Sequence, residues 1–268
     1  LAVIGGLVLV AAVVGIGSLM AGPDQNTMLK GFGFAIATLS LVPLTGYSGQ
    51  ISLAQLTFTG IGAVVMASWG ASGNIFWVFV AVAICSAVGA LVALPAMRLS
   101  GIYLALATAA FAIFCYWMVF QQQDVMPGST ASVPYLSIGP IEVGSDFGQL
   151  VVLAVAFALI ANVLVALRRS SWGRRLTAMR DSPVACATLG LNLMSTKVGV
   201  FALSAAIAGA GGALAGRTFV VDDFSLDQSL PITMLAVVGG IGSVGGALLG
   251  GLLLGMAPIA TTALAATA

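Results

Sequence analysis

The chain has 268 residues, of which 60% are hydrophobic and 6% are charged, and its net charge at pH 7 is +1. Soluble domains carry roughly 25% charged residues, so this composition, with a mean hydropathy of +1.14, excludes a soluble globular protein and predicts an integral membrane protein. The small net charge and the lack of a basic tail also exclude nucleic acid as a partner.

Apolar stretches of membrane-spanning length follow one another along the chain. Seven candidate spans are Leu1–Met20, Met28–Thr45, Ile51–Trp69, Ile75–Met97, Ile102–Phe120, Phe147–Leu167 and Val198–Gly216, and the region Pro231–Ala268 has room for two more. Backbone groups in lipid must be hydrogen-bonded internally, and no strand-like alternation indicates a barrel, so each span is predicted to be a helix. The predicted fold class is therefore all-α, a polytopic transmembrane helical bundle with about 8–9 membrane segments, some of them broken. Residues 1–268 are expected to form a single membrane domain with both ends trimmed, because the chain begins without Met inside an apolar stretch and stops without a flanking segment.

Uncharged polar residues lie at membrane depth within the segment GYSGQISLAQLTFTGIG (Gly46–Gly62). In a continuous helix four of them would share one face and two would lie beside it: Ser48, Ser52, Gln55 and Thr59 on the face, with Gln50 and Thr57 next to it. Such residues usually join helices inside a bundle, but broken helices with polar faces also line translocation paths. Both interpretations stay open, and the absence of an acid or base at mid-span argues against a proton relay.

The longest polar segment, Arg168–Lys197, predicts the orientation of the protein. It contains more than half of the nine Lys and Arg residues, and positively charged loops remain on the cytoplasmic side of a membrane. Alternating spans then place the N-terminus in the cytoplasm and the loop Gln121–Asp146 outside. The other charges sort into Arg98, Asp181 and Lys197 inside, and Asp24, Lys30, Asp124, Glu142, Asp146, Arg217, Asp222, Asp223 and Asp227 outside.

A short capped helix is predicted inside this polar segment, downstream of a helical stretch from Gly173 to Arg180. Ser182 is a suitable N-cap, and Pro183 suits the first helical position. Gly190 suits the left-handed residue that ends a helix. Two turns of helix do not hold in water without a surface to pack on. The segment is therefore either an ordinary positively charged loop or a docking element for a cytoplasmic partner.

Glycines crowd the sequence VVGGIGSVGGALLGG near the C-terminal end (residues 237–251). The segment lies at membrane depth, so a break in the helix there is tolerated only against protein or a water-filled path. We expect a broken helix in this segment. Other glycines, among them Gly212 and Gly216, are spaced four apart, as in helices whose backbones pack closely.

The chain offers little for metal or catalytic chemistry. It has no histidine, and Cys85, Cys115 and Cys186 follow no ligand spacing, so no metal site is expected and the cysteines are interpreted as packing residues. There is no G-x-x-x-x-G-K-[ST] sequence, so the chain cannot bind ATP through a P-loop of its own.

Four stretches together resemble the permease subunits of the branched-chain amino-acid ABC importer family, most closely the LivM type. They are GYSGQISLAQLTFTGIGA, RLSGIYLALATAAFA, GRRLTAMRDSPVACATLGLN followed by FALSAAIAGAGGALAG, and LPITMLAVVGGIGSVGGALLGGLLLG. They cover most of the chain after Met28.

The resemblance implies a subunit of an ATP-driven importer for branched-chain or other hydrophobic amino acids, multi-pass in the lipid bilayer of a bacterial plasma (inner) membrane. It implies a second permease subunit, two cytoplasmic ABC ATPase subunits that bind ATP and Mg, and an external substrate-binding protein. The chain itself would bind no cofactor and would not be an enzyme. The positions that match the family's ATPase-coupling segment are Gly173, Arg174, Ala178, Arg180, Asp181, Ala185, Leu189 and Gly190. The chain departs from the family pattern at Ser182, Pro183 and Ala187, where acids are usual.

Three alternatives remain. Related permeases carry urea or short amides, which would suit the same uncharged stripe. A secondary transporter would need inverted repeats and a coupling-ion site, and the sequence shows neither. An intramembrane enzyme would need a catalytic pair at membrane depth. The absence of histidine and the absence of buried acids both argue against this alternative.

Overall fold

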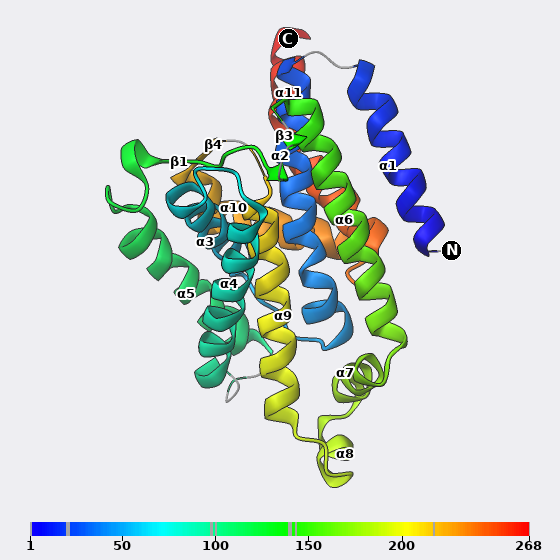
Figure 1. The fold of residues 1–268 in the computed structure, drawn as a ribbon. Helices are drawn as coiled ribbons and strands as arrows, with labels where there is room; N and C mark the ends of the chain where they lie inside the picture. Colours follow the sequence, from blue (N-terminus) through cyan, green and yellow to red (C-terminus); the bar gives the residue numbers. More distant parts are fainter. Residues whose placement is uncertain are drawn as a thin grey trace.

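Long apolar helices make up most of the structure, a computed structural model that describes residues 2–19, 22–96, 99, 101–138, 141–142, 144–216 and 218–267. The longer helices are α1 (Ala2–Leu19), α2 (Gly22–Leu39), α3 (Gln55–Trp69), α4 (Ile75–Ala96), α5 (Ile102–Cys115), α6 (Asp146–Arg169), α9 (Leu193–Ala213), α10 (Leu226–Val238) and α11 (Val244–Thr267) (Figure 1). Two shorter helices, α7 (Ser171–Asp181) and α8 (Pro183–Thr188), follow α6, and π-helical turns η1 (Val42–Tyr47) and η2 (Tyr116–Phe120) extend α2 and α5.

The apolar helices confirm the predicted helical membrane fold. Five described segments are long and apolar enough to cross a membrane: Gln25–Tyr47, Ile75–Pro95, Ile102–Phe120, Asp146–Arg169 and Leu193–Ala213. Three shorter apolar helices are Gly5–Ser18, Leu226–Val238 and Val244–Gly255. The predicted span Ile51–Trp69 is not among these eight segments, and its helix, α3, begins only at Gln55 and has 15 residues. Most predicted boundaries lie within a few residues of the observed ones. This agreement is expected, because the apolar composition of each span is a local property of the sequence.

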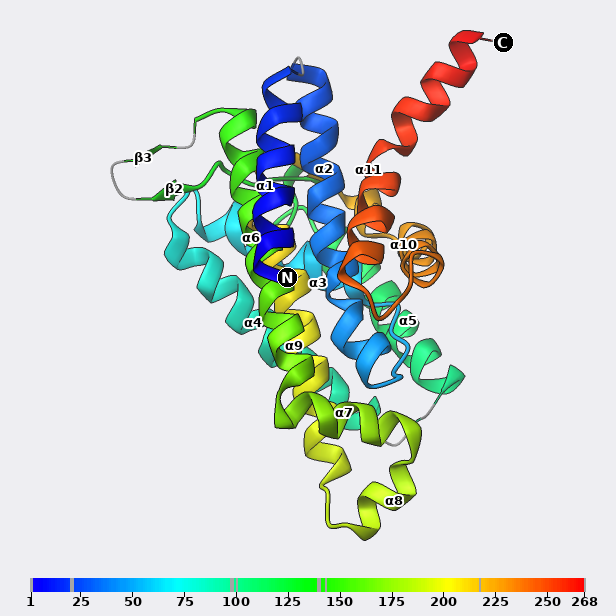
Figure 2. The same cartoon turned by 90° about the vertical axis from the view of Figure 1, so that its right-hand side faces the viewer.

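The two ends of the bundle differ in structure and charge. One end, which we name the strand end, holds two antiparallel pairs: β1 (Thr130–Ser132) with β4 (Thr218–Val220), and β2 (Ser137–Ile138) with β3 (Ile141–Glu142), together with the 3-10 turns η3 (Pro127–Ser129) and η4 (Val221–Phe224). The other, which we name the arginine end, holds α7 and α8, the lowest elements in both views of the ribbon (Figures 1 and 2). Arg98 and Arg217, and the side chains of Asp24 and Glu142, whose sides the sequence predicts, lie outside the described residues.

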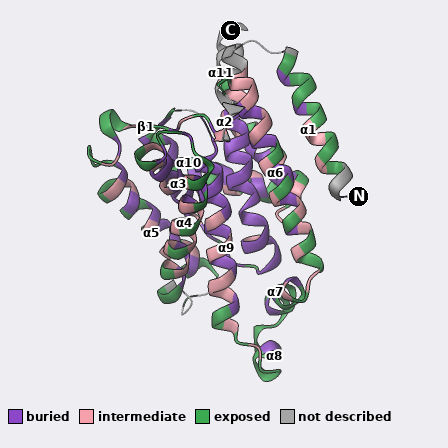
Figure 3. Ribbon diagram, viewed as in Figure 1, coloured by how far each residue is buried: buried purple, intermediate pink, exposed green. Residues whose placement is uncertain are grey.

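Helices α2, α3 and α9 form the centre of the bundle, and α9 packs against α4, α3 and α2 (Figure 3). In an 18-residue apolar stretch of the span Gln25–Tyr47 83% of residues are buried, against 22% in such a stretch of Ile75–Pro95, so α2 is central and α4 presents most of its surface outward. Glycine permits the close α3–α9 packing. A Cβ atom at Gly62 would overlap the carbonyl oxygen of Gly209, and one at Gly212 would overlap that of Thr59. The predicted packing role of Gly212 is confirmed, whereas Gly216 lies beyond the end of α9 with φ +72°.

The prediction that Ser48, Ser52, Gln55 and Thr59 share one helix face is wrong for the two serines. Residues 48–54 are not helical, and α3 begins only at Gln55. Gly49 adopts φ +71°, which turns the chain out of the helix. The backbone N–H of Leu53 donates to Thr108 Oγ1 at 3.0 Å instead of to a helical carbonyl. Tertiary contacts therefore replace helical hydrogen bonds in this segment.

The predicted break in the glycine segment is confirmed, and it is confined to five residues. Helix α10 ends at Val238 and α11 begins at Val244, with a turn over 239–243 in which Gly240 has φ +95°. The later glycines of the segment belong to α11. Gly246 lies so close to Gly239 that a Cβ atom there would overlap the Gly239 carbonyl oxygen, which lets α10 and α11 pack tightly where they meet.

Candidate functional site

The two breaks in the helices lie against each other. A Cβ atom at Gly46, in η1, would lie 2.5 Å from the carbonyl oxygen of Ile241 and 3.0 Å from Cα of Gly242, in the turn between α10 and α11. Only glycine allows the two backbones to approach this closely. The break after α2 and the break before α11 thus form one region of irregular backbone inside the bundle, which membrane proteins tolerate only where protein or water satisfies the polar groups.

The six polar residues predicted for a substrate path are all buried in this region: Ser48, Gln50, Ser52, Gln55, Thr57 and Thr59. Those outside the helix hold the irregular segment together. Ser48 donates to the carbonyl of Leu44, and Gln50 Nε2 donates to Ser48 Oγ at 3.1 Å. Ser52 Oγ accepts from the backbone N–H of Ala54 at 3.3 Å.

Gln55 connects three helices. Its Oε1 accepts a hydrogen bond from Ser40 Oγ at 2.7 Å, and Ser204 Oγ donates to the carbonyl oxygen of Ser40 at 2.6 Å. Thr59 donates to the backbone carbonyl of Gln55 within α3. Sequence reasoning missed Ser40 and Ser204. Each is a hydroxyl residue in a mostly apolar span, and it can be recognised as a partner for the amide only when the crossing of the helices is known.

Three buried polar atoms of the same region have no hydrogen-bond partner among the described residues: Gln50 Oε1, Gln55 Nε2 and Thr57 Oγ1. Leaving such a group unpaired costs about 1–3 kcal/mol. Buried polar groups are otherwise nearly always paired, so an unpaired cluster is a feature that requires an explanation. Gln50 lies in the non-helical segment that follows η1, and Gln55 and Thr57 lie in the first turn of α3.

The short capped helix predicted at Ser182–Gly190 is confirmed as α8. Ser182 Oγ accepts from the backbone N–H of Ala185 at 3.3 Å, Pro183 begins the helix, and Gly190 adopts φ +80° just after it. Helix α7 is capped in the same way, because Ser170 Oγ accepts from Gly173 N at 3.2 Å. The local sequence therefore determines both helices.

The eight predicted coupling residues separate into four groups, the last of which is Arg180 alone. Gly173 is buried where α7 turns back on α6, and a Cβ atom there would overlap the carbonyl oxygen of Leu167. A cavity of about 690 Å³ between α7, α8 and the start of α9 is lined by four of the set: Arg174, Ala178, Leu189 and Gly190. Asp181 and Ala185 are exposed nearby. Leu189 is 87% exposed, which leaves an unpartnered apolar side chain at the edge of the cavity.

Arg180 differs from the rest of the set, because it contacts the helix break. Its Nη1 donates to the carbonyl oxygen of Gly46 at 2.7 Å, and its side-chain stem packs against Gly49. A second arginine, Arg168 at the end of α6, places its guanidinium 5.6 Å from the ring centroid of Tyr47. Two cations of the arginine end therefore contact η1 and the residues that follow it, and one of them belongs to the helix that leads into α8.

Comparison with known proteins identifies the family to which the chain belongs. Residues 25–268 match the family model for the branched-chain amino acid transport system permease component. The chain is 28% identical over 252 residues to the high-affinity branched-chain amino acid transport system permease protein LivM of Escherichia coli (strain K12), a match that covers 82% of this chain and 59% of that protein. It is 28% identical over 241 residues to LivM of Salmonella typhimurium, covering 78% of this chain and 57% of the relative.

A shorter match is found to BraD of Pseudomonas aeruginosa, a high-affinity branched-chain amino acid transport system permease protein. It is 31% identical over 114 residues, covering 42% of this chain and 37% of the relative. The chain thus spans less than two thirds of the length of the relatives it matches. No solved structure matches the chain. Because the family model covers nearly the whole sequence, and the helical membrane fold agrees with it, the chain belongs to the family of permease components of branched-chain amino acid transport systems.

Proposed function

We propose that this chain is the membrane permease subunit of an ATP-driven importer for branched-chain or other hydrophobic amino acids. Membership in the permease family and the names of the LivM and BraD relatives support this substrate class. The positive-inside rule supports an orientation with the arginine end in the cytoplasm and the strand end outside. The protein would then be a multi-pass protein of a bacterial inner membrane that transports without catalysing a reaction itself.

The observation that carries the proposal is the hydrogen bond from Arg180 to the carbonyl of Gly46. It joins α7 to the helix break after α2, across 134 positions of sequence. A displacement of α7 and α8 by a cytoplasmic partner would move Arg180 and would alter the hydrogen bonding of η1 directly. The link thus gives a physical route from a partner at the arginine end to the region where helices are broken.

The cavity between α7 and α8 suits a partner of this kind. It is open at the arginine end, combines guanidinium groups with apolar side chains, and has Leu189 fully available at its edge. We therefore assign it to a cytoplasmic ATPase subunit, which would bind ATP and Mg. A second permease subunit and an external binding protein would complete the transporter, with the binding protein at the strand end.

The break region suits the passage of an amino acid. A zwitterion that leaves water must exchange its hydration for fixed dipoles, and unpaired polar groups in lipid cost several kcal/mol. The unpaired atoms of Gln50, Gln55 and Thr57 offer an acceptor, a donor and a hydroxyl. Neutral dipoles bind weakly enough for the cargo to leave again, whereas a buried charge would hold it.

Leu189→Asp tests the coupling assignment. The change places a charge where the partner is expected to bury an apolar side chain, so uptake and substrate-stimulated ATP hydrolysis by the assembled transporter should fall together while the protein still reaches the membrane. Met194→Asp is the matched control, because Met194 is also an exposed apolar residue of the arginine end (51% exposed) but does not line the cavity. Normal coupled transport in Leu189→Asp would contradict docking at α8.

A further inference from the structure

A second large cavity lies at the strand end, and none of the proposed path or coupling residues lines it. Its volume is about 710 Å³, and the residues that define its character are Lys30, Ser132, Val133, Pro134, Tyr135 and Thr218. Of the described residues that line it, Lys30 is the one that carries a charge. The rest are hydroxyl, amide, apolar and glycine residues, so the cavity combines one cation with a mixed polar and apolar wall.

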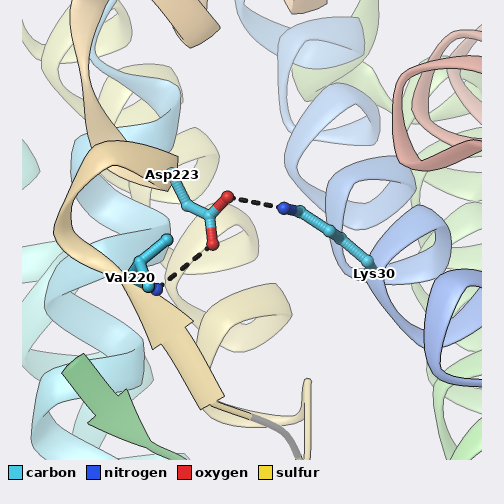
Figure 4. Close-up of polar contacts among 3 residues, drawn as sticks. All are labelled: Lys30, Val220 and Asp223. Atoms are coloured by element: carbon cyan, nitrogen blue, oxygen red, sulfur yellow. Dashed lines mark hydrogen bonds and ion pairs between the residues drawn. The ribbon is translucent and has the colours of Figure 1, made fainter. Parts of the chain in front are cut away.

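A carboxylate holds Lys30 in place but occupies only part of its hydrogen-bonding capacity. Its Nζ lies 2.6 Å from Asp223 Oδ1 (Figure 4). The same Nζ lies 5.7 Å from the ring centroid of Phe34. Asp223 Oδ2 accepts from the backbone N–H of Val220 at 3.2 Å, so both carboxylate oxygens are engaged. An ammonium group has three N–H donors. The lysine side chain is 23% exposed against 9% for the aspartate, and Lys30 but not Asp223 lines the cavity, so the ammonium group is the more accessible partner of the pair.

Tyr135, the other ionisable side chain among the described residues of the wall, stays neutral. Tyr135 donates its hydroxyl to Asp146, and this hydrogen bond, with partial burial and the nearby negative charge, raises the pKa of Tyr135 above its ordinary value. The phenol is therefore uncharged at physiological pH. Among the described residues that line the cavity, Lys30 provides the attractive charge that an entering anionic group meets.

The geometry points to this cavity as an entry site in which Lys30 binds the carboxylate of an incoming amino acid, an assignment that rests on the proposed function for the identity of the cargo. Val133 and Pro134 provide an apolar wall for a hydrophobic side chain. Asp223 competes with the cargo for the ammonium group, which keeps binding weak enough for release. Ten residues along α2 separate Lys30 from Ser40, about 15 Å of helix, so the entry site would precede the neutral region around Gln55.

Protection of a cysteine in the cavity wall tests this assignment without requiring transport. Ser132 is exposed in the wall, so Ser132→Cys in the assembled transporter lacking native cysteines should react with an impermeant thiol reagent from outside. L-leucine should slow the reaction, whereas isopentylamine, which is leucine without its carboxylate, should not. Gln122→Cys is the control, because this exposed residue lies in the same loop but does not line the cavity, and its rate should not respond to leucine.

Variants of the ion pair then test the lysine itself. Lys30→Met with Asp223→Asn removes both charges without leaving a buried one unpaired, and it should raise the half-protecting leucine concentration by about tenfold or more, as expected for loss of a charge-assisted hydrogen bond. Lys30→Arg should retain protection. Asp223→Asn alone should lower the half-protecting concentration, because the competing carboxylate is gone.

Equal protection by leucine in the neutral double variant, or equal protection by isopentylamine in the parent, would overturn the assignment. ATP-driven leucine uptake by the same preparation, with the binding protein and ATPases present, is measured separately. Uptake without Lys30-dependent protection refutes the entry site and leaves the proposed function standing, and protection without ATP-driven uptake refutes the proposed function.

Discussion

Removal of the guanidinium group of Arg180 is the sharpest test of how the arginine end communicates with the membrane region. In Arg180→Met the apolar stem that packs against Gly49 is retained, and the 2.7 Å hydrogen bond to the carbonyl of Gly46 is lost. The caps of α7 and α8 involve Ser170 and Ser182, so both helices should still form. The change therefore separates the link to η1 from the structure of the docking helices.

The size of the effect follows from the kind of hydrogen bond. A bond from a charged donor contributes about 1.5–3 kcal/mol. Arg180 is exposed, so solvent screens it and the lower end of that range applies, about 1.5 kcal/mol, which corresponds to a factor of about ten in an equilibrium. We expect the population in which α7 and η1 move together to fall by this factor.

The assay compares leucine uptake with ATP hydrolysis in proteoliposomes that contain the complete transporter. Arg180→Met should assemble and hydrolyse ATP at the basal rate, but the amount of leucine transported per ATP should fall by about tenfold. Arg169→Met removes an exposed arginine at the end of α6 and serves as the control for loss of positive charge. A wild-type ratio of leucine to ATP in Arg180→Met would refute the proposed link.

Three further predictions test the path, the orientation and the packing. Gln55→Leu removes the amide that joins α2 to α3, and uptake per assembled transporter should fall while assembly and basal ATP hydrolysis survive; unchanged uptake with lower stability would leave Gln55 as a helix-joining residue only. Ser171→Cys, in a background without native cysteines, should resist an impermeant thiol reagent in intact cells, and labelling from outside would reverse the proposed orientation. Gly212→Val forces a side chain onto the carbonyl of Thr59 and should destabilise the protein by about 1–3 kcal/mol or more in thermal unfolding, whereas Gly245→Val, where a Cβ atom meets nothing within 4 Å, should unfold near the wild-type temperature.

Features that depend on neighbouring residues could be predicted from the sequence. The positions of the membrane helices follow from runs of apolar side chains, which need no partner to be recognised. The caps of α8 follow from Ser182, Pro183 and Gly190, because a cap is a contact between residues three or four positions apart. The break in the glycine segment follows from the low helix propensity of glycine.

Features that depend on how the helices cross were decided by the tertiary structure. The segment containing Ser48 and Ser52 was predicted as helix, because its spacing fits one, but contacts with Thr108 and with neighbouring turns satisfy its backbone instead. Sequence resemblance placed Arg180 among residues that face an ATPase, and the fold directs its guanidinium to Gly46.

Lys30 shows most clearly the difference between what the sequence predicts and what the tertiary structure decides. The charge pattern of the sequence assigned this base to the outer side, where the positive-inside rule predicts few of them. Its partner, Asp223, lies 193 positions away and is brought to 2.6 Å only by the tertiary fold, in which η4 packs against α3 and α10. Hydropathy and capping are properties of short segments, whereas an ion pair between distant residues depends on the positions of whole helices, and those are set by side-chain packing throughout the bundle.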